Sequence, residues 1–487
     1  MKKYILILAA VLSFASCKEF LDINYDPNSA SPEMVSNSEI LPAAEMALCS
    51  TYGNFYRITG GFFTEQYAHF FGTSNYKDYS QFTMSQTRSS TAYSQLMQGC
   101  IANATVVRDN AAEAEEWGTY LAAVTLRVFA FQAMVDAYGE IPYTQAMNPD
   151  EYPNPEYDEG QVVYDGLVDE LEDAISKAKS DDEVATNFLY AGQDASNWIK
   201  FANALELKIL MREGKTSEAA AVIARNNFPT ADVAWSGFWS DASGKANPFY
   251  QEEFALYFGS TQINCGLNVA LYKTMSDCGD ARLQAFFSPN ASGGYWGSIS
   301  GDNMSTSGNY KSGVFCRPNI KYDSPVYLIT LSEIDFFLSE YYQKTSDANK
   351  AKQYYEEAIE ESFASAKVSG AAAVISAWPY DGTMKSIGVQ KWVALSGTNN
   401  YEAWCELRRL GYPAFSGLSA SDIYIAKDDN LDPSVLPAGT LYTPLLRDPE
   451  VGDNATIQSW PYALGSTNAN LNAPDVKKLN AKVFWAK

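Results

Sequence analysis

The chain has 487 residues, and its 35 Lys and Arg against 58 Asp and Glu give a formal net charge of −23. Nucleic acids and other polyanions are therefore excluded as ligands, because their binding needs a basic surface. His69 is the only histidine, which excludes a histidine-rich zinc site and allows only one Ser-His or Cys-His pair, whereas carboxylate acid–base chemistry stays possible.

The first residues predict a lipoprotein signal peptide, residues 1–16. Lys2 and Lys3 precede an apolar segment, residues 5–12, that is too short to span a bilayer and is typical of a secretory signal. Residues 14–17, Phe-Ala-Ser-Cys, then resemble a bacterial lipobox, in which Cys17 is acylated and becomes the first residue of the mature protein. The alternative is ordinary signal-peptidase cleavage beside an incidental cysteine. We expect a lipid anchor at Cys17, since several acyl chains together hold a protein on a membrane.

Residues 17–42 are polar and interrupted by proline, which predicts a lipidated tether and an extended leader. Oxygen-bearing side chains in residues 22–33 have the spacing of a calcium loop, but Pro27 stands where such a loop needs glycine. The remaining cysteines lack any CxxC pair, so a zinc cluster is not expected, and they are interpreted as buried thiols or an occasional disulfide: Cys49, Cys100, Cys265, Cys278, Cys316 and Cys405. We predict no metal site and no cofactor.

The following body, residues 43–487, is predicted to be all-α. Apolar residues recur every three or four positions in residues 163–175, 198–209 and 328–338, as on one face of a helix. Gly214 is expected to end the second of these helices, and Asp347 to cap the helix that follows the third. Paired helices with short breaks are typical of tetratricopeptide-like hairpins. We expect such repeats over about residues 93–226 and 326–411.

Two segments of this body are expected to be irregular. Residues 232–325 hold 11 glycines and 16 aromatic residues, and this much glycine disfavours packed helices. We interpret them as a large loop-rich insertion between the two helical regions. Residues 412–487 are rich in Pro, Asn and Gly, which predicts an irregular C-terminal segment.

Five segments, in order, resemble the SusD/RagB family of outer-membrane nutrient-binding lipoproteins. They carry the family's leader after the lipid cysteine, its helix-ending YGEIPY turn, two of its helical motifs and its C-terminal element: residues 17–28, 138–143, 198–212, 388–413 and 444–454. Residues 445–450 differ from the family's C-terminal sequence motif, so the last loop is expected to differ in structure. The resemblance covers essentially the whole chain.

The resemblance implies a tetratricopeptide-containing platform on the cell outer membrane, facing the cell surface, and Glu19 and Asp22 are similar to a surface-export signal. It further implies a non-catalytic lid that captures oligosaccharide for a TonB-dependent, SusC-like transporter, or in some members peptide. A surface glycoside hydrolase stays open as a third hypothesis, because paired catalytic carboxylates leave no spacing signature.

Binding of a neutral glycan needs aromatic faces for the sugar C–H surfaces, and loops are the expected place for them. The first candidates are Tyr295 and Trp296, which lie between glycines, and a second loop offers Asn75, Tyr76 and Tyr79. Weaker candidates in the insertion are Trp239, Tyr250 and Tyr310. The alternative for each ring is local packing.

The other aromatic and titratable residues of note are assigned to the fold. Trp117, Trp198 and Trp392 fall on helix stripes and are expected in the core. Arg408 follows Trp404 by four residues, so a cation–π contact between them would be structural. His69, at the end of an aromatic-rich helix, is expected to pack or cap rather than catalyse.

Overall fold

The structure is a computed structural model that describes residues 35–70, 75–190, 192, 194–236, 239–242, 244–255, 264–301, 315–425 and 430–487. The signal peptide, Cys17, the leader up to residue 34 and Tyr310 lie outside these residues. The predictions made for them therefore remain predictions.

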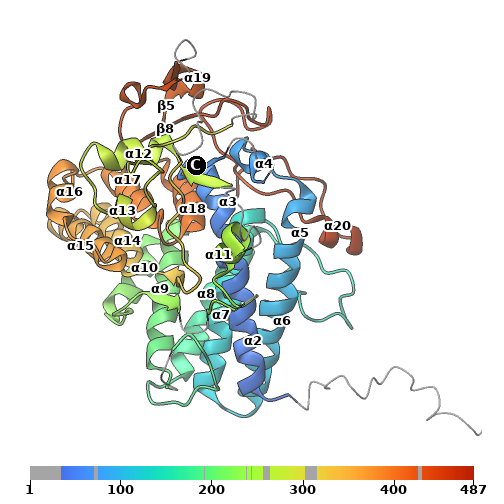
Figure 1. Ribbon diagram of the computed structural model, residues 1–487. Helices are drawn as coiled ribbons and strands as arrows, with labels where there is room; N and C mark the ends of the chain where they lie inside the picture. The colour runs from blue at the N-terminus through green and yellow to red at the C-terminus, as the bar shows by residue number, and fades with distance from the viewer. Residues whose placement is uncertain are drawn as a thin grey trace, which may run out of the picture.

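The N-terminal half is a body of long helices that stand side by side (Figure 1). Their bounds are α2 (Asn37–Thr51), α3 (Arg57–Phe63), α5 (Gln86–Ser94), α6 (Ala102–Glu113), α7 (Trp117–Tyr138), α8 (Gly160–Lys177), α9 (Ser196–Glu213) and α10 (Thr216–Ala224). A π-helical turn, η2 (Tyr52–Tyr56), joins α2 to α3, and another, η3 (Gln95–Ile101), joins α5 to α6. Neighbours in sequence pack together, α6 on α7, α7 on α8 and α8 on α9, which is the arrangement of helical hairpins.

A second helical group follows later in the chain and is coloured orange in Figure 1. It comprises α14 (Leu331–Lys344), α15 (Ala348–Ala366), α16 (Ala371–Ala377), α17 (Met384–Leu395) and α18 (Asn400–Leu410). Helices α14 and α15 form a hairpin, and α14 also contacts α9 of the first group. The predicted all-α, tetratricopeptide-like fold is confirmed.

The segment between the two groups has only short elements where it is described. They are β2 (Val233–Trp235), α11 (Pro248–Tyr250), η4 (Gln251–Ala255), β3 (Cys265–Leu267), α12 (Val269–Ser276), α13 (Arg282–Phe286) and β4 (Val326–Ile329). Strand β3 pairs antiparallel with β1 (Tyr67–His69), with Tyr67 opposite Leu267, and β2 pairs antiparallel with β4. These small sheets attach the segment to the first helical body and to the start of α14.

The remaining short elements are α4, in the N-terminal half, and those of the C-terminal part after residue 413. Their bounds are α4 (Lys77–Ser80), β5 (Ala414–Ser419), α19 (Ala420–Ile423), β6 (Tyr424–Ile425), β7 (Asn430–Leu431), η5 (Pro433–Val435), β8 (Thr440–Thr443) and α20 (Leu464–Ala469). Strands β5 and β8 are parallel, and β6 and β7 are antiparallel. Helix α20 packs against α5 of the first body, so the end of the chain returns to its beginning.

Several helices form for the reasons that the sequence offered. In α8, Val163, Leu167 and Leu171 are fully buried on one face. Helix α9 ends at Gly214, whose φ of 82° is the left-handed conformation that glycine adopts at helix ends. The side chain of Asp347 accepts the Lys350 amide at 3.1 Å and so caps α15.

Four predicted details are wrong, each for a local reason. Helix α2 starts at Asn37, within the expected leader, because Ser36 and Glu39 form a capping box. Leu328 lies in strand β4 rather than in the helix that follows. His69 lies buried in β1, not at a helix end. Trp117 is only half-buried, because it opens α7, where the Lys177 ammonium lies 5.1 Å from its ring.

Helix α7 is the centre of the first body. Among the described residues it is the one helix whose length and apolar composition would allow it to cross a membrane, yet 94% of its apolar window is buried inside the protein. It packs between α6, α8 and α9, so it has no free apolar face. We conclude that its composition reflects a core position.

The six cysteines of the described part are free thiols, and all but Cys278 are buried. Desolvation raises the pKa of the buried Cys405 and Cys100 thiols above the usual range. They therefore act as small apolar core residues, which is the first of the two interpretations that the sequence left open.

The buried carboxyl of Glu45 gives a prediction for stability against pH. It lies on α2, is 1% exposed, and accepts the amides of Phe188 at 2.7 Å and Leu189 at 3.2 Å. Burial raises its pKa from 4.5 to about 7, so the folded state holds this proton more tightly than the unfolded chain does. Its contribution to stability is complete below pH 4.5 and is lost as the pH rises through 7.

We expect Glu45→Gln to reduce the fall in unfolding free energy between about pH 5 and pH 7, by at most about 1.4 kcal/mol per pH unit. Urea unfolding at several pH values measures this slope. Glu356→Gln on the outer face of α15 is the control, and its slope should match that of the wild type. Equal slopes for Glu45→Gln and wild type would contradict the prediction.

Candidate functional site

A cavity of about 370 Å³ lies where the end of α2 meets α4, α5 and η4. We call it the α2–α5 cavity. Its wall is formed by Ser50, Thr51, Asn54, Phe55, Ile58, Asn75, Tyr76, Tyr79, Arg88, Thr91, Ala92, Gln95 and Glu252. The volume is that of a small-molecule site.

Three π-helical turns meet at this cavity. Asn54 and Phe55 come from η2, Gln95 from η3 and Glu252 from η4. These are the π-helical turns of the described residues, and each contributes to the wall. A π turn widens a helix by one residue and is frequent at functional sites, because it turns side chains out of the regular face. Because three separate π-helical turns contribute residues to its wall, we favour this cavity as the candidate ligand-binding site.

The wall is polar and carries two ionisable side chains, Arg88 and Glu252. The Thr51 hydroxyl donates to Gln95 Oε1 at 3.1 Å, and the Arg88 guanidinium is bound by Asp78 at 2.6 Å. Burial raises the pKa of Glu252 above its usual value, although the charge of Arg88 opposes this. The other polar groups of the wall are amides and hydroxyls, which donate and accept hydrogen bonds.

Asn75, Tyr76 and Tyr79, predicted from the sequence, all line this cavity. The tyrosine rings stack with centroids 5.9 Å apart and an interplanar angle of 16°. They are only 7% and 5% exposed, because both pack on Phe62, so they support the wall rather than form the open platform that we expected. The buried Tyr76 hydroxyl has no hydrogen-bond partner among the described residues.

The backbone of Tyr76 supports the same location. Its φ is 61°, in the left-handed region that a bulky side chain rarely adopts. Such strain is held by the surrounding structure and is concentrated at binding and catalytic sites. Here the contacts of the ring with Phe62 and Tyr79 hold it in place.

The loop with Tyr295 and Trp296 lies elsewhere and does not line the α2–α5 cavity. Both rings are half-buried and pack against the core. The Trp296 ring lies 5.8 Å from the Tyr272 ring of α12, and its amide donates to Cys316 Sγ at 3.3 Å. Trp239 also packs inward, 6.0 Å from the Trp235 ring. In this structure the rings of Tyr295, Trp296 and Trp239 thus make local packing contacts.

Tyr250 belongs to a small aromatic surface on α11 and η4. Its ring stacks on Phe254 with centroids 5.2 Å apart and an interplanar angle of 10°, and Tyr322, 38% exposed, meets it edge-on at 6.4 Å. The Arg317 guanidinium lies 4.2 Å from the Phe254 ring. The same segment sends Glu252 into the cavity, so this surface borders the site without being part of its wall.

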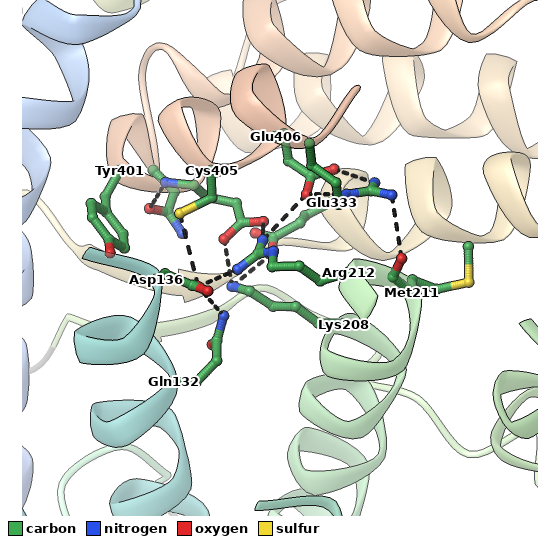
Figure 2. A network of polar contacts seen from close by, with 12 residues as sticks. Gln132, Asp136, Lys208, Met211, Arg212, Glu333, Tyr401, Cys405 and Glu406 are labelled. Atoms are coloured by element: carbon green, nitrogen blue, oxygen red, sulfur yellow. Dashed lines mark hydrogen bonds and ion pairs between the residues drawn. The ribbon is translucent and has the colours of Figure 1, made fainter. Parts of the chain in front are cut away.

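The largest group of titratable side chains lies in the core, between α7, α9, α14, α17 and α18 (Figure 2). Four cations pair with five carboxylates there: Lys208, Arg212, Lys391 and Arg409, with Asp136, Glu333, Glu340, Glu402 and Glu406. We call them the core charge network. No member is more than 6% exposed, and none lines the α2–α5 cavity, so a substrate cannot reach these carboxylates.

The network shows how buried charges are balanced. Burial raises the pKa of Glu333 to about 7 even though the Lys208 ammonium lies 3.0 Å away. Burial would also raise the pKa of Glu406, but the charges of Arg409 and Lys391 hold it well below its usual value. The core charge network joins helices of the first helical group, α7 and α9, to helices of the second, such as α14 and α18.

The predicted contact between Trp404 and Arg408 is confirmed as a structural one. The guanidinium lies 3.4 Å from the ring centroid, and both side chains are at most 2% exposed. Arg408 also donates to the backbone carbonyls of Asp136 and Gln458 and so ties α18 to α7 and to the C-terminal segment.

The chain matches a protein family described as "Starch-binding associating with outer membrane", the SusD-like family, over residues 29–434. Among solved structures it is similar to a SusD homologue from Bacteroides uniformis, with a TM-score of 0.70 and 19% identity over 92% of this chain and 99% of that one. A chitin-binding protein gives a TM-score of 0.69 and 19% identity over 93% and 100%. A SusD-like protein from Bacteroides thetaiotaomicron gives 0.68 and 18% over 93% and 99%. Curated protein sequences give no significant match. At these identities the structural likeness establishes the fold.

Proposed function

This chain belongs to the SusD-like family, and from that premise we propose that it captures an uncharged oligosaccharide in the α2–α5 cavity. The observation that carries the proposal is the wall of this cavity, where the amides of Asn54 and Gln95, on two π-helical turns, lie with hydroxyl groups of α2 and α5 beside two stacked tyrosines. Sugar hydroxyls need such groups, which both donate and accept.

The electrostatics of the chain support an uncharged ligand. The net charge of −23 opposes the approach of anionic glycans, and in the cavity Arg88 is already bound by Asp78.

In this proposal the protein is a non-catalytic lid. Cys17, once acylated, anchors it in the outer membrane, and the body delivers its ligand to a TonB-dependent, SusC-like transporter. The family description, which joins binding to association with the outer membrane, supports this arrangement. Capture of a peptide by the same lid is the alternative, and a surface glycoside hydrolase is a further one.

Isothermal titration calorimetry with neutral gluco-, manno- and xylo-oligosaccharides, an anionic oligogalacturonide and oligopeptides tests the ligand class. We expect saturable binding of at least one neutral oligosaccharide and no binding of the anionic one. The double variant Asn54→Ala, Gln95→Ala should weaken binding about tenfold or more, because each lost hydrogen bond contributes about 0.5–1.5 kcal/mol.

Trp296→Ala is the matched control, since this ring lies outside the cavity wall, and its affinity should stay within about twofold of the wild type. Binding of peptides alone would replace the proposal with its alternative. New reducing ends after incubation with the same oligosaccharides would contradict a non-catalytic role. Loss of binding in Trp296→Ala but not in the double variant would move the site to the other loop.

A further inference from the structure

The α2–α5 cavity continues into two further hollows along the outer face of α5 and η3. The second hollow, of about 540 Å³, is lined by Ser90, Thr91, Ser94, Gln95, Gln98 and Gly99. It shares Thr91 and Gln95 with the α2–α5 cavity, so the two are contiguous. The three hollows together form what we call the α5 groove.

The third hollow, of about 260 Å³, lies between η3, the loop after α7, and α20. It shares Ser94 and Gln98 with the second hollow, which makes the groove continuous. Its wall is more apolar, with Met97 and Met147 and three prolines. Met147 has a φ of 64°, a second strained bulky residue on the wall of the groove after Tyr76.

The groove is free of charge over most of its length. Charged residues make up 19% of the chain, yet the walls of the second and third hollows contain none. The second wall offers hydroxyls and amides, and the third offers apolar side chains with Asn470 and Ser466. A surface of this kind fits a ligand that carries hydroxyl groups and C–H faces but no charge.

The arrangement of the hollows around the helix sets the form of that ligand. From this helical segment the first hollow is lined by Arg88, Ala92 and Gln95 and the third by Tyr93 and Met97, so the two overlap along the helix axis and lie on different faces. The second hollow lies between them on the outer face. A linear oligosaccharide of several units would cross this outer face and contact each hollow in turn.

We infer that the protein binds its oligosaccharide as an extended, unbranched segment along the α5 groove, with the third hollow as a distal subsite. This inference rests on the proposed function and adds the form of the ligand. The first hollow supplies the polar end, with the side chains of Asn54 and Gln95. The distal subsite supplies apolar contact to the far units.

Calorimetry with ladders of linear glucan, mannan and xylan oligomers, from two to eight units, tests the inference. For the ladder that binds, affinity should rise at least about tenfold between the short and the long members and then level off. Gln98→Trp, at an exposed position of η3, should weaken the long members at least about tenfold and leave the shortest within about twofold. Thr87 is exposed on the same helical segment but lies outside the groove, so Thr87→Trp should change the affinity for neither the long nor the short oligomers.

The outcomes separate this inference from the function on which it rests. If affinity does not depend on length, or if Gln98→Trp weakens short and long members equally, the extended mode is overturned while binding in the α2–α5 cavity stands. If no member of any ladder binds, the proposed function fails and the inference fails with it. Met147→Ala provides a second check, since it should again affect only the long members.

Discussion

Replacing Arg212 with Met should lower the free energy of unfolding by about 3–5 kcal/mol, the cost of leaving buried carboxylates without their partner. The Arg212 side chain is fully buried, lies 2.5 Å from Asp136 and contacts Glu402. Methionine fills a similar volume, so the loss reflects charge and hydrogen bonding rather than a cavity. Urea unfolding followed by circular dichroism measures the change.

Lys352→Met is the matched control for this variant. Lys352 pairs with Glu356 at 2.6 Å, but its side chain is 57% exposed, so we expect a change within about 0.5 kcal/mol. Arg212→Lys keeps the positive charge but loses the guanidinium that can contact two carboxylates at once. Its loss of unfolding free energy should therefore lie between those of Arg212→Met and Lys352→Met. An Arg212→Met variant as stable as the control would show that the core charge network contributes little to stability.

The second large effect is expected for Thr91→Trp. Thr91 is exposed on α5 and lines both the α2–α5 cavity and the second hollow. An indole at this position would occupy the space that a sugar needs while leaving the core intact. Affinity for neutral oligosaccharides should fall at least about 100-fold, a change of about 2.8 kcal/mol in binding free energy.

Thr87→Trp adds the same side chain one helical turn earlier, outside the cavity wall, and should bind like the wild type. Equal melting temperatures of the two variants establish that both are folded. If Thr91→Trp binds as tightly as Thr87→Trp, the α2–α5 cavity is not the site.

Much of the helical architecture could be predicted because it depends on local patterns. The stripe of Val163, Leu167 and Leu171 in α8, the glycine after α9 and the Asp347 cap are signals that a helix carries in its own residues. The start of α2 was missed because Pro42 suggested an extended leader, whereas Pro42 lies inside the helix and the capping box at Ser36 sets its start.

The site could be predicted only in part. Of the wall of the proposed site, Asn75, Tyr76 and Tyr79 were predicted because they are polar and aromatic residues in a loop, whereas Asn54, Gln95 and Glu252 were not. These three belong to π-helical turns, which have no sequence signature and depend on how the helices pack. The glycine-flanked Trp296, also predicted as a ligand contact, packs near Tyr272 of α12 and lies outside the wall of the proposed site.

The sequence also carried one signal for the groove that went unused. Thr91, Ser94, Gln95 and Gln98 recur at helical spacing, which places them on one uncharged outer face. Only the structure shows that this face is hollowed and joined to the cavity. Local patterns thus predict the helices, whereas the proposed site depends on tertiary packing.

A crystal structure with a bound neutral oligosaccharide, taken from the panel above, tests the central claim most directly. The account predicts electron density in the α2–α5 cavity, with sugar hydroxyls in hydrogen-bond contact with Asn54 and Gln95, and further units along the outer face of α5. Density on the Tyr250 and Phe254 rings or beside Trp296, with the α2–α5 cavity filled only by water, would contradict it.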